Sequence, residues 1–288
     1  MSEVVLITGA DGLLGSEFRS ISASSVRGRK ILGKSHRELD ITDLRQVRRN
    51  VEELRPNFIV NCAAYRDIDK AESDRDSAYR VNVEGPRNLA EISRQAGVKL
   101  VHFSTHGVFD GEKAGPYLES DAVFPLNHYA ATKLEGERVV ASILPQAQCL
   151  VLRVAWPFGA KGNNFIHQIL ERAKRQPEIR VVADQIGVPN PARLLAAKTL
   201  ELLDQADGLF HLSCLGSCSR FELMAFLVEA LKLNCHLIPV TAAEFPTIAK
   251  RPRNMAIATE RETIAKKLEM PHWREALSQY LAEGKNLT

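Results

Sequence analysis

The N-terminal stretch restricts the fold of this chain more than any other part, because an apolar run leads into a glycine-rich loop and then into a helix. Residues 4–7 are uninterrupted aliphatic side chains, as expected of a strand buried on both faces. Gly9, Gly12 and Gly15 follow with the spacing G-x-x-G-x-x-G, ahead of a helix predicted over residues 16–22. Glycines at such positions let the backbone turn sharply and approach a pyrophosphate, whose charge the helix N-terminus stabilises. The alternative is a tight strand–helix turn without a ligand, and the buried first strand favours the dinucleotide site.

Strands and helices alternate after this loop. The predicted strands cover residues 30–32, 58–63, 98–104 and 149–154, and the predicted helices cover residues 44–54, 79–95 and 134–143. This alternation predicts an α/β fold with a doubly wound parallel sheet of the Rossmann type.

The remainder of the chain changes character. We predict helices over residues 165–174, 191–203, 221–231 and 263–268, a short strand over 180–182 and a sheet-edge strand over 209–212. No internal repeat or low-complexity linker separates the two parts. We therefore expect a dinucleotide-binding domain formed by residues 1–157 and 192–214. A smaller α/β substrate-binding domain, formed by 158–191 and 215–288, should pack closely on it.

Composition limits the classes of function. The net charge of +3 is too small to indicate nucleic-acid binding, and no apolar stretch approaches the ~20 residues of a membrane span. The N-terminus enters the first strand directly, so we expect no signal peptide and a cytoplasmic protein. Five scattered cysteines are expected to be reduced thiols, and Cys214 and Cys218 to be small buried residues rather than metal ligands.

Basic side chains follow the second predicted strand. A site that prefers NAD usually places Asp or Glu here, on the adenosine ribose hydroxyls. Lys34, His36 and Arg37 occupy this stretch instead, and they suit a 2′-phosphate. A solvated loop is the alternative interpretation. The sequence therefore favours NADP(H), with NAD(H) as the second option.

A tyrosine and a lysine are spaced for catalysis near residue 130. If Asn127 caps the helix that follows, Tyr129 and Lys133 lie one turn apart on the same face. A free tyrosine has a pKa of about 10, and a fixed ammonium nearby would lower the pKa of the phenol and make it a usable acid. On an ordinary helix the same pair is a solvated lysine stem over a half-buried ring. Thr105 ends the strand predicted over residues 98–104, where ligands of parallel sheets bind, and so supplies a hydroxyl at the same site.

Together, the glycine motif, Thr105 and Tyr129-x-x-x-Lys133 resemble the extended branch of the short-chain dehydrogenase/reductases. Within that branch, the resemblance is strongest to the dTDP-4-dehydrorhamnose reductase family, and it runs nearly from end to end. The further motifs that carry it are residues 39–43, 61–65, 69–72, 82–86, 108–111, 125–127, 133–137, 164–165, 184–189 and 251–253.

The resemblance implies an NAD(P)H-dependent oxidoreductase that reduces a 4-keto nucleotide sugar, most closely the reductase of dTDP-L-rhamnose biosynthesis. Tyr129 would protonate the developing alkoxide, Thr105 would donate a second hydrogen bond to it, and Lys133 would hold the nicotinamide ribose. The predicted cofactor-binding residues are Gly9, Asp11, Gly12, Leu13, Leu14, Gly15, Lys34, Arg37, Asp40, Ile41, Cys62, Ala63, Ala64, Tyr65, Tyr129, Lys133 and Trp156. The predicted substrate-binding residues are Thr105, His106, Gly107, Trp156, Asn164, Gln185 and Arg251.

Two segments depart from the family pattern. The chain has His106 and Gly107 where the family usually has Asp and Tyr, and residues 66–68 read Arg-Asp-Ile where Thr-Ala-Val is typical. Both segments should border the sugar pocket, although His106 is equally well interpreted as a loop residue that faces water. We therefore expect poor turnover of dTDP-4-dehydrorhamnose relative to some related nucleotide sugar.

Two other functions remain open at this stage. One is the reduction of a different nucleotide deoxysugar. The other is a non-catalytic, NADP-binding regulatory subunit similar to that of methionine adenosyltransferase, against which the intact Thr105, Tyr129 and Lys133 argue. We expect a nucleotide sugar as the partner, and neither a nucleic acid nor a membrane. A requirement for Mg²⁺ and the oligomeric state stay open, with a homodimer as one option.

Overall fold

A computed structural model of the chain describes residues 2–21, 28–159, 161 and 165–283. A six-stranded parallel sheet with the order β10-β5-β4-β3-β1-β2 forms its centre, as the sequence predicted. The strands are β1 (Val4–Thr8), β2 (Lys30–Lys34), β3 (Phe58–Asn61), β4 (Lys99–Thr105), β5 (Cys149–Val154) and β10 (Gly208–His211). Because β1 lies between β2 and β3, the winding of the chain reverses there, and ligands of such sheets bind beyond the strand ends at this point.

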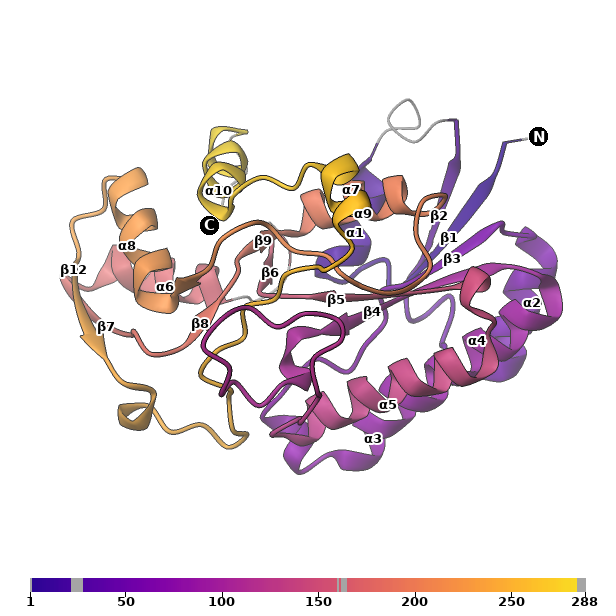
Figure 1. Ribbon diagram of the computed structural model, residues 1–288, viewed down its shortest axis with the longest axis horizontal. Coiled ribbons are helices and arrows are strands. Elements are labelled where there is room, and N and C mark those ends of the chain that lie inside the picture. The colour runs from indigo at the N-terminus through magenta and orange to yellow at the C-terminus, as the bar shows by residue number, and fades with distance from the viewer. Residues whose placement is uncertain (1, 22–27, 160, 162–164, 284–288) are drawn as a thin grey trace.

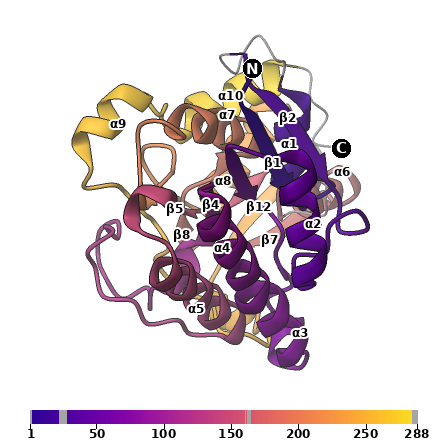
Figure 2. The same cartoon turned by 90° about the vertical axis from the view of Figure 1, so that its right-hand side faces the viewer.

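Helices cover both faces of the sheet. Figure 1 shows α2 (Leu44–Leu54), α4 (Gly85–Ala96) and α5 (His128–Ile143) below it and α1 (Leu13–Ser20) and α7 (Ala192–Leu202) above it, and Figure 2 shows the same layers from the side. The strands are apolar on both faces. On β1, Val5 and Ile7 pack into the core that includes Phe18 of α1, whereas Leu6 packs into the opposite core with Val47 of α2.

A second, smaller group of elements lies at one end of the sheet (Figure 1). It contains α6 (Phe165–Arg175), β7 (Glu178–Val182), α8 (Arg220–Ala230), β12 (His236–Val240) and α10 (Trp273–Ala282), and β7 and β12 pair in parallel. Buried side chains such as Leu170, Leu223 and Trp273 form its core. Short paired strands join it to the sheet: β6 (Pro157–Phe158) with β9 (Asn190–Pro191), and β8 (Ile186–Gly187) with β11 (Cys218–Ser219). The helix α9 (Glu262–Leu268) returns to the sheet core through Ile264 and Leu268, and the division into two domains stays a proposal.

Several elements differ from those expected. The first helix begins at Leu13 rather than residue 16, because Gly12 already has the extended backbone of an N-cap. The helix predicted over 79–95 is composite, with α3 (Arg75–Tyr79), a π-helical turn (Arg80–Glu84) and α4 in succession. Neither β12 nor α10 was predicted. Single 3₁₀ turns occupy Lys70–Glu72, His106–Val108, Gln146–Gln148 and Ala242–Glu244.

All five cysteines are free thiols, and Cys214 and Cys218 are buried as predicted. Within the described ranges, no helix has the length and apolar character needed to cross a membrane.

Candidate active site

A cavity of about 860 Å³ opens beyond the carboxyl ends of β1, β3, β4 and β5. It lies where the reversed winding of the sheet places a ligand site. The predicted residues that line it are Gly9, Asp11, Gly12, Leu13, Leu14, Arg37, Asp40, Ile41, Cys62, Ala63, Ala64, Tyr65, Thr105, His106, Tyr129 and Trp156. Arg66 and Ile68, from the segment expected to border the sugar pocket, also line it, as do Val81, Pro157 and Phe165, which sequence reasoning did not assign.

The glycine loop leaves no room for side chains at two of its positions. Gly9 has a φ of 62°, and a Cβ there would lie 2.7 Å from the amide nitrogen of Ala63. A Cβ on Gly15 would lie 2.9 Å from the Cα of Ala10. No side chain caps α1, whose N-cap is Gly12, and its first turn carries no acidic residue. The exposed amide groups of this helix end fit an anion such as a cofactor pyrophosphate.

The cations around the end of β2 differ in part from the predicted set. His36 and Arg37 line the cavity, but Lys34 does not. Arg19, in the last turn of α1, was not predicted; it does not line the cavity either, and its Nη1 lies 3.1 Å from Asp11 Oδ1. The Arg19 side chain crosses β2 over Gly33, where a Cβ would lie 2.8 Å from the Arg19 Cδ. Gly33, near the end of β2, could have indicated this contact from the sequence, because a glycine in a strand leaves space for a side chain from the helix packed above it.

The carboxylate of Asp40 also lies at this end of the cavity. Its Oδ1 accepts hydrogen bonds from the Thr42 amide (2.9 Å) and hydroxyl (2.8 Å) and lies 3.9 Å from His36 Nδ1. These contacts fix the carboxylate beside the loop that carries the cations.

Two buried asparagines hold the wall formed by residues 62–65. Asn61 accepts a hydrogen bond from the Ala63 amide at 3.2 Å. Asn82, in the π-helical turn, accepts from the Tyr65 amide (2.9 Å) and donates to the Tyr65 carbonyl (3.1 Å) and to a threonine hydroxyl of α5 (3.1 Å). The π turn thereby fixes this wall against α5, and such turns occur frequently at functional sites.

Thr105 and Tyr129 are brought together on the cavity wall. Asn127 caps α5 as predicted, with its Oδ1 2.8 Å from the Ala130 nitrogen, and this cap sets the first turn that carries Tyr129. Both side chains line the cavity, and the Thr105 hydroxyl acts to lower the pKa of the Tyr129 phenol. Thr105 Oγ1 also accepts from the Gly107 amide (3.1 Å), so its own proton is available to an oxygen on the cavity side.

The expected effect of Lys133 on Tyr129 is wrong for this structure. Burial raises the pKa of Tyr129 above its usual value of 10, and the Thr105 hydroxyl only opposes this change. Lys133 Nζ donates instead to the Phe103 carbonyl (2.6 Å) and does not line the cavity. Burial lowers the pKa of Lys133 to about 8.

A buried histidine faces the Lys133 amine. The Ala63 amide fixes the orientation of the Asn61 side chain, whose NH₂ lies 3.1 Å from His102 Nδ1 and therefore donates to it. The proton of His102 then resides on Nε2, which lies 3.5 Å from Lys133 Nζ. Burial and the Lys133 charge hold the pKa of His102 well below its usual value, so the ring is neutral. The N–H of His102 Nε2 and the ammonium of Lys133 are both donors and cannot hydrogen-bond to each other. This arrangement disfavours the charged form of Lys133, in addition to the effect of burial.

His106 lines the cavity rather than facing water. Its Nδ1 lies 2.9 Å from the Val154 carbonyl, to which it must donate, so Nε2 is left as an acceptor. Burial is the main reason that the pKa of His106 falls to about 4, and the charge of Arg220 lowers it further. Gly107 does not line the cavity, and a Cβ there would meet no atom closer than 3.4 Å.

Trp156 adopts a strained conformation where β5 enters the cavity. Its φ of 28° is rarely adopted by a residue with a side chain. The indole lies directly on Gly187, where a Cβ would be 2.6 Å from Trp156 Cζ2. The guanidinium of Arg220 covers the ring at 5.1 Å. Gly187 therefore makes room for the aromatic wall of the cavity.

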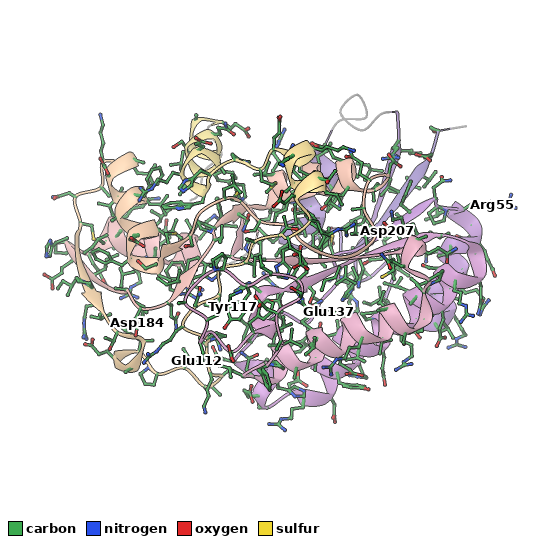
Figure 3. All side chains as sticks on the ribbon, in the orientation of Figure 1. Arg55, Glu112, Tyr117, Glu137, Asp184 and Asp207 are labelled. Carbon is green, nitrogen blue, oxygen red and sulfur yellow. The ribbon has the colours of Figure 1, made fainter. Side chains whose placement is uncertain are left out.

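Behind the catalytic strands, a buried ion pair joins α5 to the sheet. Arg153 Nη2 of β5 lies 2.8 Å from Glu137 Oε2 of α5, and Glu137 also accepts a hydrogen bond from Ser104. Figure 3 labels Glu137. The ion pair connects the helix that carries Tyr129 with the strand that carries Thr105.

The remaining predicted residues lie apart from the main cavity. Gln185 and Arg251 line a neighbouring cavity of about 320 Å³. Arg251 Nη2 lies 2.8 Å from Asp69 Oδ2 and so is already paired with a carboxylate. Asn164 lies outside the described residues.

Comparisons with known proteins agree with this geometry. The family model described as "RmlD substrate binding domain" matches residues 3–286. The dTDP-4-dehydrorhamnose reductase of Aggregatibacter actinomycetemcomitans is 34% identical over 291 residues, which cover 96% of this chain and 98% of the relative. The spore coat polysaccharide biosynthesis protein SpsK of Bacillus subtilis (strain 168) is 33% identical over 280 residues, 97% of each chain. Among solved structures, a dTDP-4-dehydrorhamnose reductase from Bacillus anthracis in complex with NADP is 36% identical, with a TM-score of 0.93 over 98% of this chain and 100% of that chain.

Proposed function

This chain belongs to the RmlD substrate binding domain family, and from that premise we propose that it is an NADPH-dependent reductase of a 4-keto nucleotide sugar, with dTDP-4-dehydrorhamnose as the first candidate substrate. The observation that carries the proposal is that Thr105 and Tyr129 line the same cavity as the glycine loop. This pair favours an enzyme over a non-catalytic regulatory subunit.

The described residues fit NADP(H). The uncapped N-terminus of α1 would hold the pyrophosphate, and Arg37 with Arg19 would hold the 2′-phosphate. The residues 62–65 would lie against the cofactor, as would Trp156. Lys133, whose buried ammonium is costly, is the candidate for the ribose hydroxyls. When bound, the reduced nicotinamide supplies the hydride.

The chain itself supplies a proton and a place for the substrate oxygen. The raised pKa of Tyr129 keeps the phenol protonated near neutral pH, so it can protonate an alkoxide, which is a much stronger base. Thr105, which accepts from the Gly107 amide, directs its own proton to the same oxygen. Both donors are fixed before the substrate arrives, which lowers the reorganisation required in the transition state.

A second candidate of the same class is a reductase of another nucleotide deoxysugar. The observation that favours it is the neutral His106, whose Nε2 presents an acceptor to the cavity. An acceptor at this position selects a sugar with a hydroxyl directed at it, because a mismatched sugar leaves a buried group unpaired.

The direct test is NADPH oxidation with a panel of nucleotide 4-keto sugars that includes dTDP-4-dehydrorhamnose, with NADH as the parallel reductant. We expect substrate-dependent oxidation of NADPH by at least one member. A protein that binds NADPH but reduces none of them, and that co-purifies with an unrelated enzyme, would instead fit the regulatory subunit.

We further propose that the protein acts in the cytoplasm and that a homodimer is one of its states. Light scattering of the purified chain measures its mass in solution. The same oxidation assay with added Mg²⁺ or with EDTA tests whether a divalent cation is needed.

A further inference from the structure

Arg220, the first residue of α8, is held in an unusual setting. Its guanidinium lies 4.3 Å from the centroid of the Phe165 ring and 5.1 Å from that of the Trp156 ring. Its Nε donates to Gln185 Oε1 at 2.9 Å. Aromatic faces stabilise a cation, but they satisfy none of its hydrogen-bond donors. The terminal nitrogens, Nη1 and Nη2, are therefore left for another partner.

The two fully buried arginines of the described chain have carboxylate partners. Arg153 pairs with Glu137 at 2.8 Å, and Arg29 pairs with Asp204 at 2.6 Å. Arg220 has no acidic side chain within ion-pair distance among the described residues, and the nearest charge that affects it is another cation, Arg251. The guanidinium is half-buried between two aromatic rings and lacks a counterion among the described residues, which is costly, so its retention points to an anion that arrives with a ligand.

Arg220 lies on the substrate side of the main cavity. Trp156 and Phe165 line both the main cavity and a small adjoining pocket of about 90 Å³, and Arg220 lines that pocket. Its charge also reaches His106, the neighbour of Thr105. The glycine loop, where a cofactor pyrophosphate fits, belongs to the opposite part of the cavity wall, after β1.

We propose that Arg220 binds the diphosphate of the nucleotide sugar, with Gln185, Trp156 and Phe165 holding the guanidinium in place. The inference rests on the proposed function, which supplies a substrate with a diphosphate between its sugar and its nucleoside. A planar guanidinium with two free nitrogens matches two phosphate oxygens, whereas a lysine offers only a point charge. Arg220 is therefore a specificity-determining residue for the anionic part of the substrate.

The test compares dTDP, thymidine and inorganic pyrophosphate as probes, titrated by calorimetry into protein saturated with NADP⁺. The variants are Arg220→Gln, Arg220→Lys and the control Arg180→Gln. Arg180→Gln removes one positive charge from β7, where the side chain is half exposed and paired with Glu244. We expect Arg220→Gln to weaken the binding of dTDP and of pyrophosphate roughly 10- to 100-fold and to leave the affinity for thymidine unchanged. The affinity of Arg220→Lys for dTDP and pyrophosphate should lie between those of Arg220→Gln and the wild type. Arg180→Gln should bind all three probes as the wild type does.

Each other outcome overturns the assignment. If Arg220→Gln weakens the binding of thymidine as much as that of dTDP, the guanidinium serves only to hold Trp156 and Phe165 in position and does not bind the diphosphate. If dTDP and pyrophosphate bind Arg220→Gln as well as the wild type, the diphosphate lies elsewhere, and a carboxylate on the sugar becomes the candidate anion. A wild-type protein that binds neither anionic probe also excludes the diphosphate assignment. The panel assay of NADPH oxidation tests the proposed function separately, so an active wild type with an unaffected Arg220→Gln variant contradicts this inference alone.

Discussion

Arg37 lines the cavity from the loop after β2, whereas Arg19, at the end of α1, pairs with the cavity residue Asp11 at 3.1 Å. Lys34 lies between them in the sequence, yet it does not line the cavity. Of the basic residues predicted near the second strand, His36 and Arg37 do line the cavity, and their role at a 2′-phosphate stays a prediction. An α-helix packed above a glycine in β2 supplied one cation that the loop itself does not contain.

This geometry predicts which cations discriminate NADPH from NADH. We expect the double substitution Arg19→Ala with Arg37→Ala to weaken NADPH binding by about 1.5–3 kcal/mol for each cation removed from the phosphate. The affinity for NADH should change little. Lys34→Ala is the matched control and should change neither affinity much. Fluorescence titration of both cofactors measures the difference. Equal weakening of NADPH and NADH by the double substitution would remove the 2′-phosphate assignment.

The buried position of Lys133 predicts a pH-dependent stability of the cofactor-free protein. Its pKa is about 8 in the folded chain, below the usual value of 10.5, because of burial. The ammonium is thus costly below pH 8, and the cost disappears as the pH rises towards the pKa of the unfolded chain. A shift of this size corresponds to about 3 kcal/mol. Relative to Lys133→Met, the wild type should gain stability between about pH 8 and 10.5 in urea unfolding, and parallel curves for the two proteins would refute this prediction.

The departure at His106 and Gly107 predicts a change of sugar preference. The neutral His106 offers an acceptor, and a Cβ on Gly107 would make only ordinary contacts, at 3.4 Å or more. We expect His106→Asp with Gly107→Tyr to shift the ratio of kcat/KM towards dTDP-4-dehydrorhamnose. Steady-state rates on two nucleotide sugars measure the ratio. If the wild type already reduces that compound efficiently and the double change impairs it, the selectivity hypothesis is wrong.

At the scale of elements, the contacts between α5, β4 and β5 determine where Thr105 and Tyr129 meet. Glu137 of α5 and Arg153 of β5 are both almost fully buried, with side chains 8% and 4% exposed. The Asn82 side chain holds α5 to the wall that follows β3. The cap and the strands could be predicted from local sequence patterns. The ion pair could not, because its two residues belong to different elements and carry no joint sequence signal.

Removing one partner of this ion pair should lower the free energy of unfolding more than removing both partners. Arg153→Met leaves the Glu137 carboxylate buried without its cation, and we expect a loss of about 3–5 kcal/mol in the free energy of unfolding. Arg153→Met with Glu137→Leu removes both charges and should be clearly more stable than Arg153→Met alone. Urea denaturation of the four proteins of this cycle gives the coupling energy. Additive effects of the two substitutions would show that the pair is not coupled.

At the scale of the whole molecule, the substrate side of the cavity is assembled from distant parts of the chain. Trp156 follows β5, Gly187 belongs to β8 and Arg220 begins α8, and the indole contacts both of the others. The motif over residues 184–189 was recognised from the sequence, but its physical reason, the indole that lies on Gly187, is visible only in three dimensions. Arg220 had no motif around it, so its role could not be predicted. The glycine loop and the strand ends were predictable because each is a local pattern with a fixed position in a parallel sheet.

In the proposed function, Tyr129 supplies the proton and Thr105 the second hydrogen bond in a hydride-transfer reaction. The most direct measurement is the turnover of Tyr129→Phe and Thr105→Val on the best sugar of the panel, at NADPH concentrations that saturate each protein. We expect turnover by Tyr129→Phe to fall roughly 10²–10⁴-fold while NADPH affinity is preserved, because the ring stays and only the transferable proton is removed. Thr105→Val should also reduce turnover without loss of NADPH binding. Near-normal turnover of Tyr129→Phe would contradict the assignment of the acid.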